Sequence, residues 1–283
     1  MPRRISAAAV FLAILGLASC GGRSSTGPLL PVAQRITASA LWIPRAGSSY
    51  AIQYGGTKLD TSVAASIYDV DGFDTSAATV ASLHAKGRRV VCYIDVGTWE
   101  NWRPDAGAFP KSVLGKPDGG WPGERWLDIR RLSVLEPLMS ARFQICKSKG
   151  FDAVDPDNID GYTNRTGFRL TAAEQLRYDR WVARTIHVLG MSVAQKNDGA
   201  QIGALRASFD WAVTEQCYSQ HWCGLFASYT NENRLVVDIE YGITNAAFRR
   251  NVCPAAARYR ETALLKHLSL NAWAVRCPVL DPP

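Results

Sequence analysis

The stretch Phe151-Asp-Ala-Val-Asp155-Pro-Asp157-Asn158 follows a helical segment over residues 134–149 that ends at Gly150. A helix that stops at a glycine and leads into a short apolar run is typical of a repeating unit in a parallel sheet. Period-two alternation places Asp155 and Asp157 on one face of this strand. If the sheet closes on itself, that face is its interior, and the sequence predicts two acids pointing inward at one strand end.

Seven other segments have the composition of strands, and long amphipathic segments lie between them. Eight strands within roughly 240 residues predict a (β/α)8 TIM barrel, which typically needs ~250 residues, as a single domain over residues 40–283. A doubly wound α/β sheet is the alternative, but no glycine-rich phosphate turn follows the first strand. The other strands are expected at 50–54, 65–70, 89–96, 191–197, 210–217, 235–241 and 268–273, and the helices at 76–86, 134–149, 172–189 and 245–250.

Residues 1–19 have the pattern of a signal peptide, with two arginines, an apolar run and small residues before Cys20. The run Leu17-Ala-Ser-Cys20 resembles a bacterial lipoprotein box and predicts lipidation of Cys20, with an ordinary secretory signal as the alternative. Residues 20–39 then form a flexible tether. Gly21 follows the cysteine where an inner-membrane retention signal has aspartate. We therefore expect an exported monomer at the outer membrane or cell surface, held to the membrane by its lipid alone.

The charge balance is modestly basic, with 32 lysines and arginines against 25 acids. No run of basic residues is interleaved with aromatic ones, so a nucleic-acid partner is not expected. The four histidines are scattered, and no metal site is predicted.

Six cysteines follow Cys20, and an even number in an exported chain predicts three disulfides. The spacing of the cysteines determines their pairing only in part. Cys217 and Cys223 are close enough to close one loop, and Cys253 can reach Cys277, which leaves Cys92 and Cys146. Strand parity agrees with the last pair, because Cys92 is expected to face the helix that carries Cys146.

Acids also stand at the ends of other predicted strands. In Asp210-Trp-Ala-Val-Thr-Glu215-Gln-Cys217, the side chains of Trp211, Val213 and Glu215 share a face, with Cys217 continuing it at the rim. Paired carboxylates on a rigid scaffold suit glycoside cleavage, because one protonates the leaving oxygen while the other attacks the sugar or activates water. Asp157 and Glu215 are the predicted catalytic pair. Asp71, Asp95, Asp238 and Glu240 end other strands, with a structural role as the alternative for Asp71 and Asp238.

The segment 97–131 is the longest insertion between predicted strands, and it contains four tryptophans. It is expected to form a lid or wall beside the site, or else a satellite cluster that packs for stability. The tryptophans are Trp99, Trp102, Trp121 and Trp126.

With these motifs in order, the chain resembles a bacterial lipoprotein member of glycoside hydrolase family 114, the endo-α-1,4-polygalactosaminidases. The resemblance runs through the predicted domain. It rests on Tyr68-Asp-Val-Asp71-Gly-Phe-Asp74, Asn101-Trp-Arg-Pro-Asp105, Gly123-Glu-Arg-Trp-Leu-Asp128, Gly150-Phe-Asp-Ala-Val-Asp155-Pro-Asp157-Asn158-Ile-Asp160, Gln195-Lys196-Asn197-Asp198 and Glu215-Gln-Cys217.

The resemblance implies a (β/α)8 barrel, no cofactor, and cleavage inside polymers of α-1,4-linked galactosamine. It implies Asp157 as nucleophile and Glu215 as general acid and then base, with the reversed assignment as the alternative. A retaining reaction predicts carboxyl groups about 5–5.5 Å apart, and an inverting one about 6.5–9.5 Å.

A cationic sugar also calls for acidic and aromatic subsites. Asp71, Asp95, Asp155 and Glu240 are expected to bind the ammonium, Tyr93 and Tyr218 to stack on the sugar, and Asn158, Lys196 and Asn197 to hold the acids and substrate.

Two departures from the family pattern concern subsite preference. Tyr50-Ala-Ile-Gln53 stands where the family often has Trp-Gln-Trp-Gln, and Asp95 stands where a small serine is common.

Two other functions compete with hydrolysis. One is a non-catalytic carbohydrate-binding lipoprotein on a degenerate barrel, which the presence of Asp157 and Glu215 argues against. The other is a metal-dependent deacetylase, for which His221 is the sole histidine near a predicted strand end.

Overall fold

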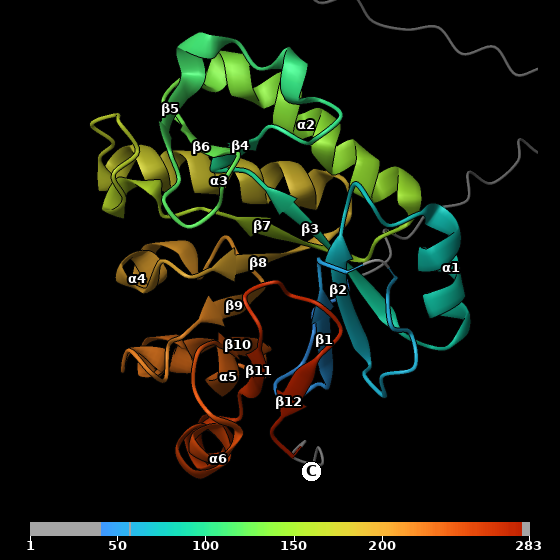
Figure 1. Ribbon diagram of the computed structural model, residues 1–283. Helices are drawn as coiled ribbons and strands as arrows, with labels where there is room; N and C mark the ends of the chain where they lie inside the picture. The colour runs from blue at the N-terminus through green and yellow to red at the C-terminus, as the bar shows by residue number, and fades with distance from the viewer. Residues whose placement is uncertain (1–40, 57, 279–283) are drawn as a thin grey trace, which may run out of the picture. The chain divides into compact units, whose positions relative to one another are not determined.

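The computed structural model describes residues 41–56 and 58–278. Eight parallel strands follow one another around a (β/α)8 barrel, as the sequence predicts, and each pairs with its neighbours in chain order (Figure 1). A short antiparallel strand, β12 (Ala274–Arg276), extends the sheet from β11. The eight strands are β1 (Tyr50–Gln53), β2 (Ile67–Asp71), β3 (Arg89–Asp95), β7 (Ala153–Asp157), β8 (Ser192–Lys196), β9 (Trp211–Glu215), β10 (Val236–Glu240) and β11 (Thr262–Lys266).

Polar side chains join β1 to β11, where the barrel closes. The Thr262 hydroxyl donates to the Ser48 carbonyl, and the Lys266 ammonium donates to the Ile52 carbonyl at 2.9 Å. Burial lowers the pKa of Lys266 to about 8. Lys266 also donates to the Asn271 carbonyl and thereby holds the loop after β11 against the barrel.

The helices lie around the outside of the barrel. α2 and α3 are the longest and cover β3, β7 and β8 (Figure 1). Local signals set their ends: α3 begins at a capping box between Thr171 and Glu174, and α2 ends at Gly150 with a φ of 89° that favours glycine. The helices are α1 (Ala77–Ala85), α2 (Leu132–Lys149), α3 (Ala172–Val188), α4 (Ile202–Leu205), α5 (Ala227–Asn231), α6 (Asn245–Ala247), a π-helical segment Phe248–Val252 and α7 (Cys253–Tyr259).

A small antiparallel sheet covers the carboxyl ends of β3 and β7. Its strands come from the tryptophan-rich insertion and are β4 (Thr98–Glu100), β5 (Leu114–Pro117) and β6 (Glu124–Leu127), paired in the order β4-β6-β5. Single turns of 3-10 helix complete the loops: Ala106–Ala108, Lys111–Val113, Gly161–Thr163, Gly199–Gln201 and Cys223–Phe226.

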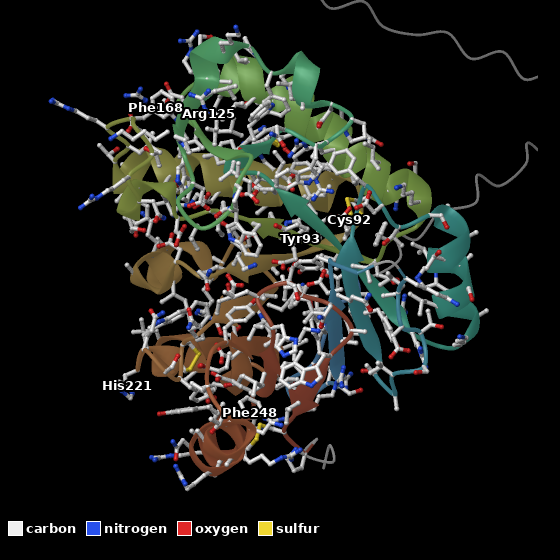
Figure 2. The ribbon with its side chains drawn as sticks, viewed as in Figure 1. Cys92, Tyr93, Arg125, Phe168, His221 and Phe248 are labelled. Atoms are coloured by element: carbon white, nitrogen blue, oxygen red, sulfur yellow. A yellow bond between two sulfur atoms is a disulfide. The ribbon has the colours of Figure 1, made fainter. Side chains whose placement is uncertain are left out.

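Strand alternation divides the core into two layers. One layer fills the barrel and includes Val91, Trp211 and Val213, and the other lies between the strands and the helices and includes Cys92 and Val154. Figure 2 labels Cys92 and Tyr93, neighbours on β3: the Cys92 sulfur bonds to α2, whereas Tyr93 lines the cavity at the mouth of the barrel. The floor of that cavity is therefore the inward face of the strands.

The last strand corrects the prediction over 268–273. The eighth barrel strand is Thr262–Lys266, and the predicted segment is a loop in which Leu270 has a φ of 44°. Leu268 is 62% exposed, so its apolar character does not reflect burial. The true strand was missed because its inward end is Lys266, a lysine that is 2% exposed and interrupts the apolar pattern.

The structure joins Cys92 to Cys146, Cys217 to Cys223 and Cys253 to Cys277. These are the pairs that the sequence favours, and they tie β3 to α2, close the loop after β9, and tie α7 to the end of β12. Within residues 41–56 and 58–278, no helix has the length and apolarity needed to cross a membrane. The predicted signal peptide, Cys20 and the tether over 20–39 lie outside the described residues.

Candidate active site

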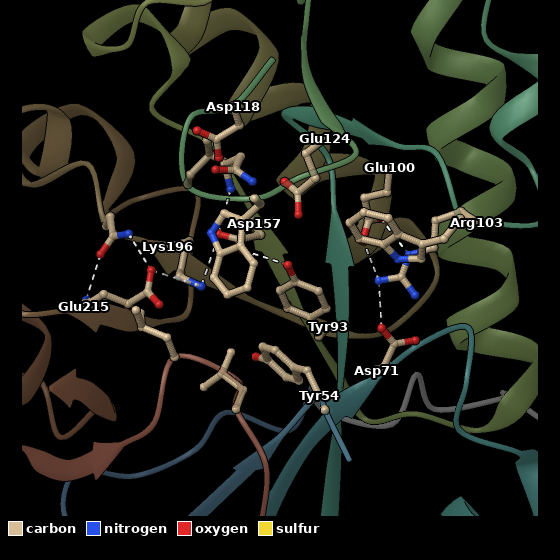
Figure 3. A pocket seen from close by; sticks show the side chains of 18 of the residues that line it. Tyr54, Asp71, Tyr93, Glu100, Arg103, Asp118, Glu124, Asp157, Lys196 and Glu215 are labelled. Atoms are coloured by element: carbon tan, nitrogen blue, oxygen red, sulfur yellow. Dashed lines mark hydrogen bonds and ion pairs between the residues drawn. The ribbon is translucent and has the colours of Figure 1, made fainter. Parts of the chain in front are cut away.

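A cavity of about 430 Å³ opens at the carboxyl ends of the barrel strands (Figure 3). This is the end at which barrels of this type carry their functional groups. Eight described residues that line it carry carboxyl groups and two carry cationic groups. The acids are Asp71, Asp74, Glu100, Asp118, Glu124, Asp157, Asp160 and Glu215, and the cations are Arg103 and Lys196.

Asp157 ends β7 and is held by three donors. The Tyr93 hydroxyl donates to Oδ2 at 2.8 Å, the Asn158 backbone N–H donates to Oδ1 at 2.8 Å, and the Lys196 ammonium lies 3.1 Å from Oδ1. Asn158 adopts the left-handed conformation, with a φ of 60°. Donors on both oxygens fix the carboxylate and stabilise its negative charge.

Glu215 ends β9, across the cavity from Asp157 (Figure 3). The Tyr241 hydroxyl donates to Oε1 at 2.8 Å, and the Asn197 amide donates to Oε2 at 3.3 Å. The Asn197 side-chain oxygen also accepts the backbone N–H of Glu215 at 2.9 Å. The Glu215 side chain is 31% exposed and that of Asp157 is 19% exposed, so Glu215 is the more accessible acid.

Lys196, at the end of β8, lies between the two acids (Figure 3). Its ammonium is 3.1 Å from Asp157 Oδ1, 3.7 Å from Glu215 Oε2 and 3.9 Å from Asp155 Oδ2. Burial alone would lower the Lys196 pKa, but the charges of these carboxylates outweigh burial and raise it well above its ordinary value. Lys196 is therefore a fixed cation in the site.

A second layer of carboxyl groups lies beneath the cavity. Asp69 and Asp155 are fully buried, and the Tyr54 hydroxyl oxygen is 2.8 Å from Asp69 Oδ2 and 3.1 Å from Asp155 Oδ2. Tyr50 also donates to Asp69 Oδ2, at 2.6 Å. Because Tyr54 has one hydroxyl hydrogen, it can donate to only one of the two carboxyl groups. The other contact is favourable when that carboxyl is protonated and donates to Tyr54.

The pKa directions agree with one shared proton. Burial raises the pKa of Asp69 well above its ordinary value, and the charge of Asp155 adds to this effect. Burial raises the pKa of Asp155 to about 6, against the lowering effect of Lys196. The two groups therefore titrate as a pair rather than separately.

Asp95, at the end of β3, lies below the cavity and supports its wall. It is fully buried, and its oxygens accept from the Thr98 N–H at 2.7 Å and the Asn158 amide at 2.7 Å. The Thr98 hydroxyl also donates to Glu124, a cavity residue whose pKa burial raises to about 7. Asp95 thus positions Asn158 and the start of the insertion.

The insertion supplies the opposite wall of the cavity. Arg103 lies 2.7 Å from both Asp71 and Glu100, so these two lining acids are already paired with a cation. Trp102 and Trp121 line the cavity and are 51% and 43% exposed. Trp126 also lines the cavity, whereas the Trp99 indole donates to the Ala106 carbonyl and packs against the core.

The comparison with known families decides the class of protein. The chain matches glycoside-hydrolase family GH114 over residues 32–279. The protein belongs to family GH114. It is accordingly a glycoside hydrolase, and the carboxylate pair at its strand ends is of the kind that this chemistry uses.

Solved structures show the same fold. The chain is 34% identical to Ega3 from Aspergillus fumigatus, solved as a complex with galactosamine, with a TM-score of 0.80 over 84% of this chain and 98% of that one. The glycoside hydrolase domain of PelA from Pseudomonas aeruginosa shares the fold, with 13% identity and a TM-score of 0.64 over 81% of this chain and 98% of that one. Among proteins with curated descriptions, none matches the chain.

In this GH114 chain the structure brings most of the predicted site residues to one place. Asp157, Glu215, Asp71, Tyr93, Asn158, Lys196 and Asn197 line the cavity. Asp155 and Asp95 lie directly beneath it and contact the residues that line it, so they are not open to a substrate.

Tyr218 and Glu240 correct the expectation that both bind the substrate. The Tyr218 and Ser219 N–H groups donate to Glu240, and the Tyr218 hydroxyl bonds to Glu261, on the outer side of the barrel. Unbroken alternation from Glu215 already directs Tyr218 outward, and Gln216, with a φ of 56°, turns Cys217 outward as well. On β10 it is Val237 and Ile239 that face inward, so Asp238 and Glu240 face outward.

Sequence reasoning missed several residues of the site. Tyr54 and Tyr241 hold the acids from β-strand ends, yet a tyrosine there looks like an ordinary core residue. Asp160 lines the cavity from a quoted motif, and Arg103 and Glu124 arrive from the insertion, whose path no local pattern predicts. A described group of possible metal donors, Cys217, Cys223 and Asp238, has its sulfur atoms in a disulfide.

Proposed function

We propose that this GH114 hydrolase cleaves internal α-1,4-galactosaminidic bonds in a galactosamine-containing exopolysaccharide. The observation that carries the proposal is the charge of the cavity: eight carboxyl groups and two cations line it, in a chain whose formal net charge is +7. An amino sugar carries an ammonium, and nearby charges dominate the field inside a cleft. The galactosamine in the Ega3 complex, a structure 34% identical to this chain, supports the same substrate class.

The contacts of the two acids support distinct roles. Asp157 has donors at 2.8, 2.8 and 3.1 Å, which suit a nucleophile that stays ionised. Glu215 accepts from Tyr241 at 2.8 Å, but its contacts to Asn197 and Lys196 are longer, at 3.3 and 3.7 Å, and it is the more exposed acid. Glu215 therefore protonates the leaving oxygen and then activates water, and Asp157 forms the covalent bond to the sugar.

The position of Lys196 limits the separation of the two acids to a range that includes the retaining geometry. The Asp157 and Glu215 oxygens that face its ammonium cannot be further apart than the sum of their distances to it, about 7 Å. Retaining enzymes need about 5–5.5 Å between carboxyl groups, and inverting ones need about 6.5–9.5 Å to admit a water molecule. The upper bound reaches only the lower end of the inverting range.

The substrate assignment is tested with chains of matched linkage. The purified protein should shorten α-1,4-linked galactosamine oligomers, and it should cleave α-1,4-linked galactose oligomers of equal length at least about tenfold more slowly, because they lack the ammonium. Reducing ends measure the rates, with Glu215→Gln as the blank and Glu136→Gln, on the outer helix α2, as the matched control. Equal rates on charged and neutral oligomers would refute the assignment.

For location, we propose an exported lipoprotein anchored through Cys20 at the outer membrane or cell surface. The lipobox-like run in the sequence supports this, as do three disulfides, which persist in oxidising compartments. Labelling cells with a radioactive fatty acid tests the anchor. The wild-type chain should carry the label and Cys20→Ala should not; an unlabelled wild-type chain would leave ordinary secretion as the route.

A further inference from the structure

A second cavity of about 410 Å³ adjoins the first at Glu215. Asp160, Asn197 and Glu215 line both cavities, whereas Asp157 lines only the first. The two cavities therefore meet at the proposed acid and continue as one cleft past it. A polymer cut at an internal bond occupies space on both sides of that bond, so the second cavity is available to one of the two parts.

We propose that the second cavity is the subsite for the galactosamine unit on the leaving-group side of the cleaved bond, with its ammonium held by Asp198 and Asp160 and its ring against Trp222. This inference rests on the proposed function and deepens it. The side follows from the chemistry: the general acid protonates the leaving oxygen, so the leaving sugar lies beside Glu215.

The charges in this cavity favour a cation. Asp160, Asp198 and Glu215 line it, and none of its described lining residues is lysine or arginine. Asp198 is 6% exposed; its Oδ1 accepts from the Tyr162 hydroxyl at 2.8 Å, and its Oδ2 has no hydrogen-bond partner within the described chain. An unpaired buried acceptor is unfavourable, and a bound ammonium would supply the missing donor after a small shift of the side chain.

Both acids have raised pKa values. Burial raises the pKa of Asp160 to about 7, and the negative charge of Asp198 adds to this effect. Burial likewise raises the pKa of Asp198 to about 6. A bound ammonium favours the ionised form of both groups, so cation binding and proton release are linked at this point of the cleft.

A closed loop presents the aromatic face. The Cys217–Cys223 disulfide closes the loop after β9. Within this loop the backbone N–H of Trp222 donates to the Cys217 carbonyl at 2.9 Å. The Trp222 ring packs on Phe226 with ring centroids 5.8 Å apart. The loop therefore holds Trp222 in place before any sugar binds, which lowers the entropy lost on binding.

The test compares two substrates that differ in their leaving group. An α-1,4-linked galactosamine tetramer needs a subsite for its leaving sugar, whereas α-galactosaminyl fluoride releases only fluoride. Trp222→Ala and Asp198→Asn should each lower kcat/KM for the tetramer about tenfold. Hydrolysis of the fluoride should stay within about twofold of wild type. Asp198→Asn keeps the acceptor for Tyr162, and melting temperatures show that each variant is folded.

Other outcomes overturn the inference. Equal losses on tetramer and fluoride would mean that these residues act on the catalytic acids, and no loss on either would mean that the cavity is unused. If the wild type cleaves no galactosamine oligomer, the proposed function fails, and calorimetry with an α-1,4-linked galactosamine dimer still tests the cavity. Trp222→Ala should then weaken dimer binding about tenfold, and equal affinity would refute the subsite.

Discussion

Two layers of carboxyl groups at the same end of the barrel behave differently. Asp157 and Glu215 line the cavity and are surrounded by donors, whereas Asp69 and Asp155 lie beneath it and share Tyr54. Asp155 and Asp157 are only two residues apart on one face of β7. Strand parity therefore determines which side of the sheet an acid faces. The position of the acid along the strand then determines whether its carboxyl group reaches the cavity or is buried and takes up a proton.

The largest expected effect is on the upper layer. Asp157→Asn and Glu215→Gln should each lower kcat on galactosamine oligomers by about 10²–10⁴-fold or more, because each removes a group that acts only during bond cleavage. Rates of reducing-end release measure the effect. Retention of more than a tenth of the wild-type rate by either variant would remove that residue from the catalytic pair.

The next effect concerns Lys196, the cation between the two acids of the upper layer. Lys196→Met should lower kcat about 10²-fold, because the positions and charges of both acids depend on the ammonium. The variant should also unfold about 3–5 kcal/mol more easily, since three carboxyl groups lose their buried partner. Urea unfolding and oligomer hydrolysis are the measurements, with the exposed Lys147→Met on α2 as control. A fully stable Lys196→Met protein would contradict the buried ion cluster.

A pH series separates the layers further. The folded-state pKa of Asp155 is raised from 3.8 to about 6, so the native state binds more protons than the unfolded state between these values. The stability linked to this group is therefore complete below about pH 4 and lost as pH rises through about 6, by up to ~3 kcal/mol. Asp155→Asn should remove this contribution and make the fall in stability from pH 4 to 7 less steep, as urea unfolding would show, while acids such as Glu124 and Asp160 keep theirs. If the dependence of the unfolding free energy on pH is unchanged in Asp155→Asn, Asp155 does not take part in binding the shared proton.

The smallest expected effect is at the outer wall. Trp121→Ala should raise KM for long galactosamine oligomers by about two- to tenfold and leave kcat unchanged, because its exposed ring lines the cavity wall and would stack on sugars remote from the cleaved bond. Oligomers of increasing length measure this dependence. A fall in kcat equal to the rise in KM would instead tie the insertion to the acids.

Local patterns predict much of the barrel and its acids. The alternation in the strands that end at Asp157 and Glu215 continues unbroken to those residues, so their inward direction can be read directly. The prediction fails where one backbone angle or one buried charge interrupts the pattern: Gln216 turns Cys217 outward where alternation directs it inward, and Lys266 places a buried charge in the eighth strand. Partners such as Arg103 and Glu124 come from an insertion whose fold depends on tertiary contacts.

The most direct test of the two-acid account is the anomeric form of the first product. Proton NMR can follow the ends released from an α-1,4-linked galactosamine hexamer before they mutarotate. Asp157 attacks the face opposite the leaving oxygen, and water then displaces Asp157 from the face that the leaving oxygen vacated, which predicts that the α-anomer appears first. Initial appearance of the β-anomer would contradict a covalent intermediate on Asp157 and would instead require a single displacement by water.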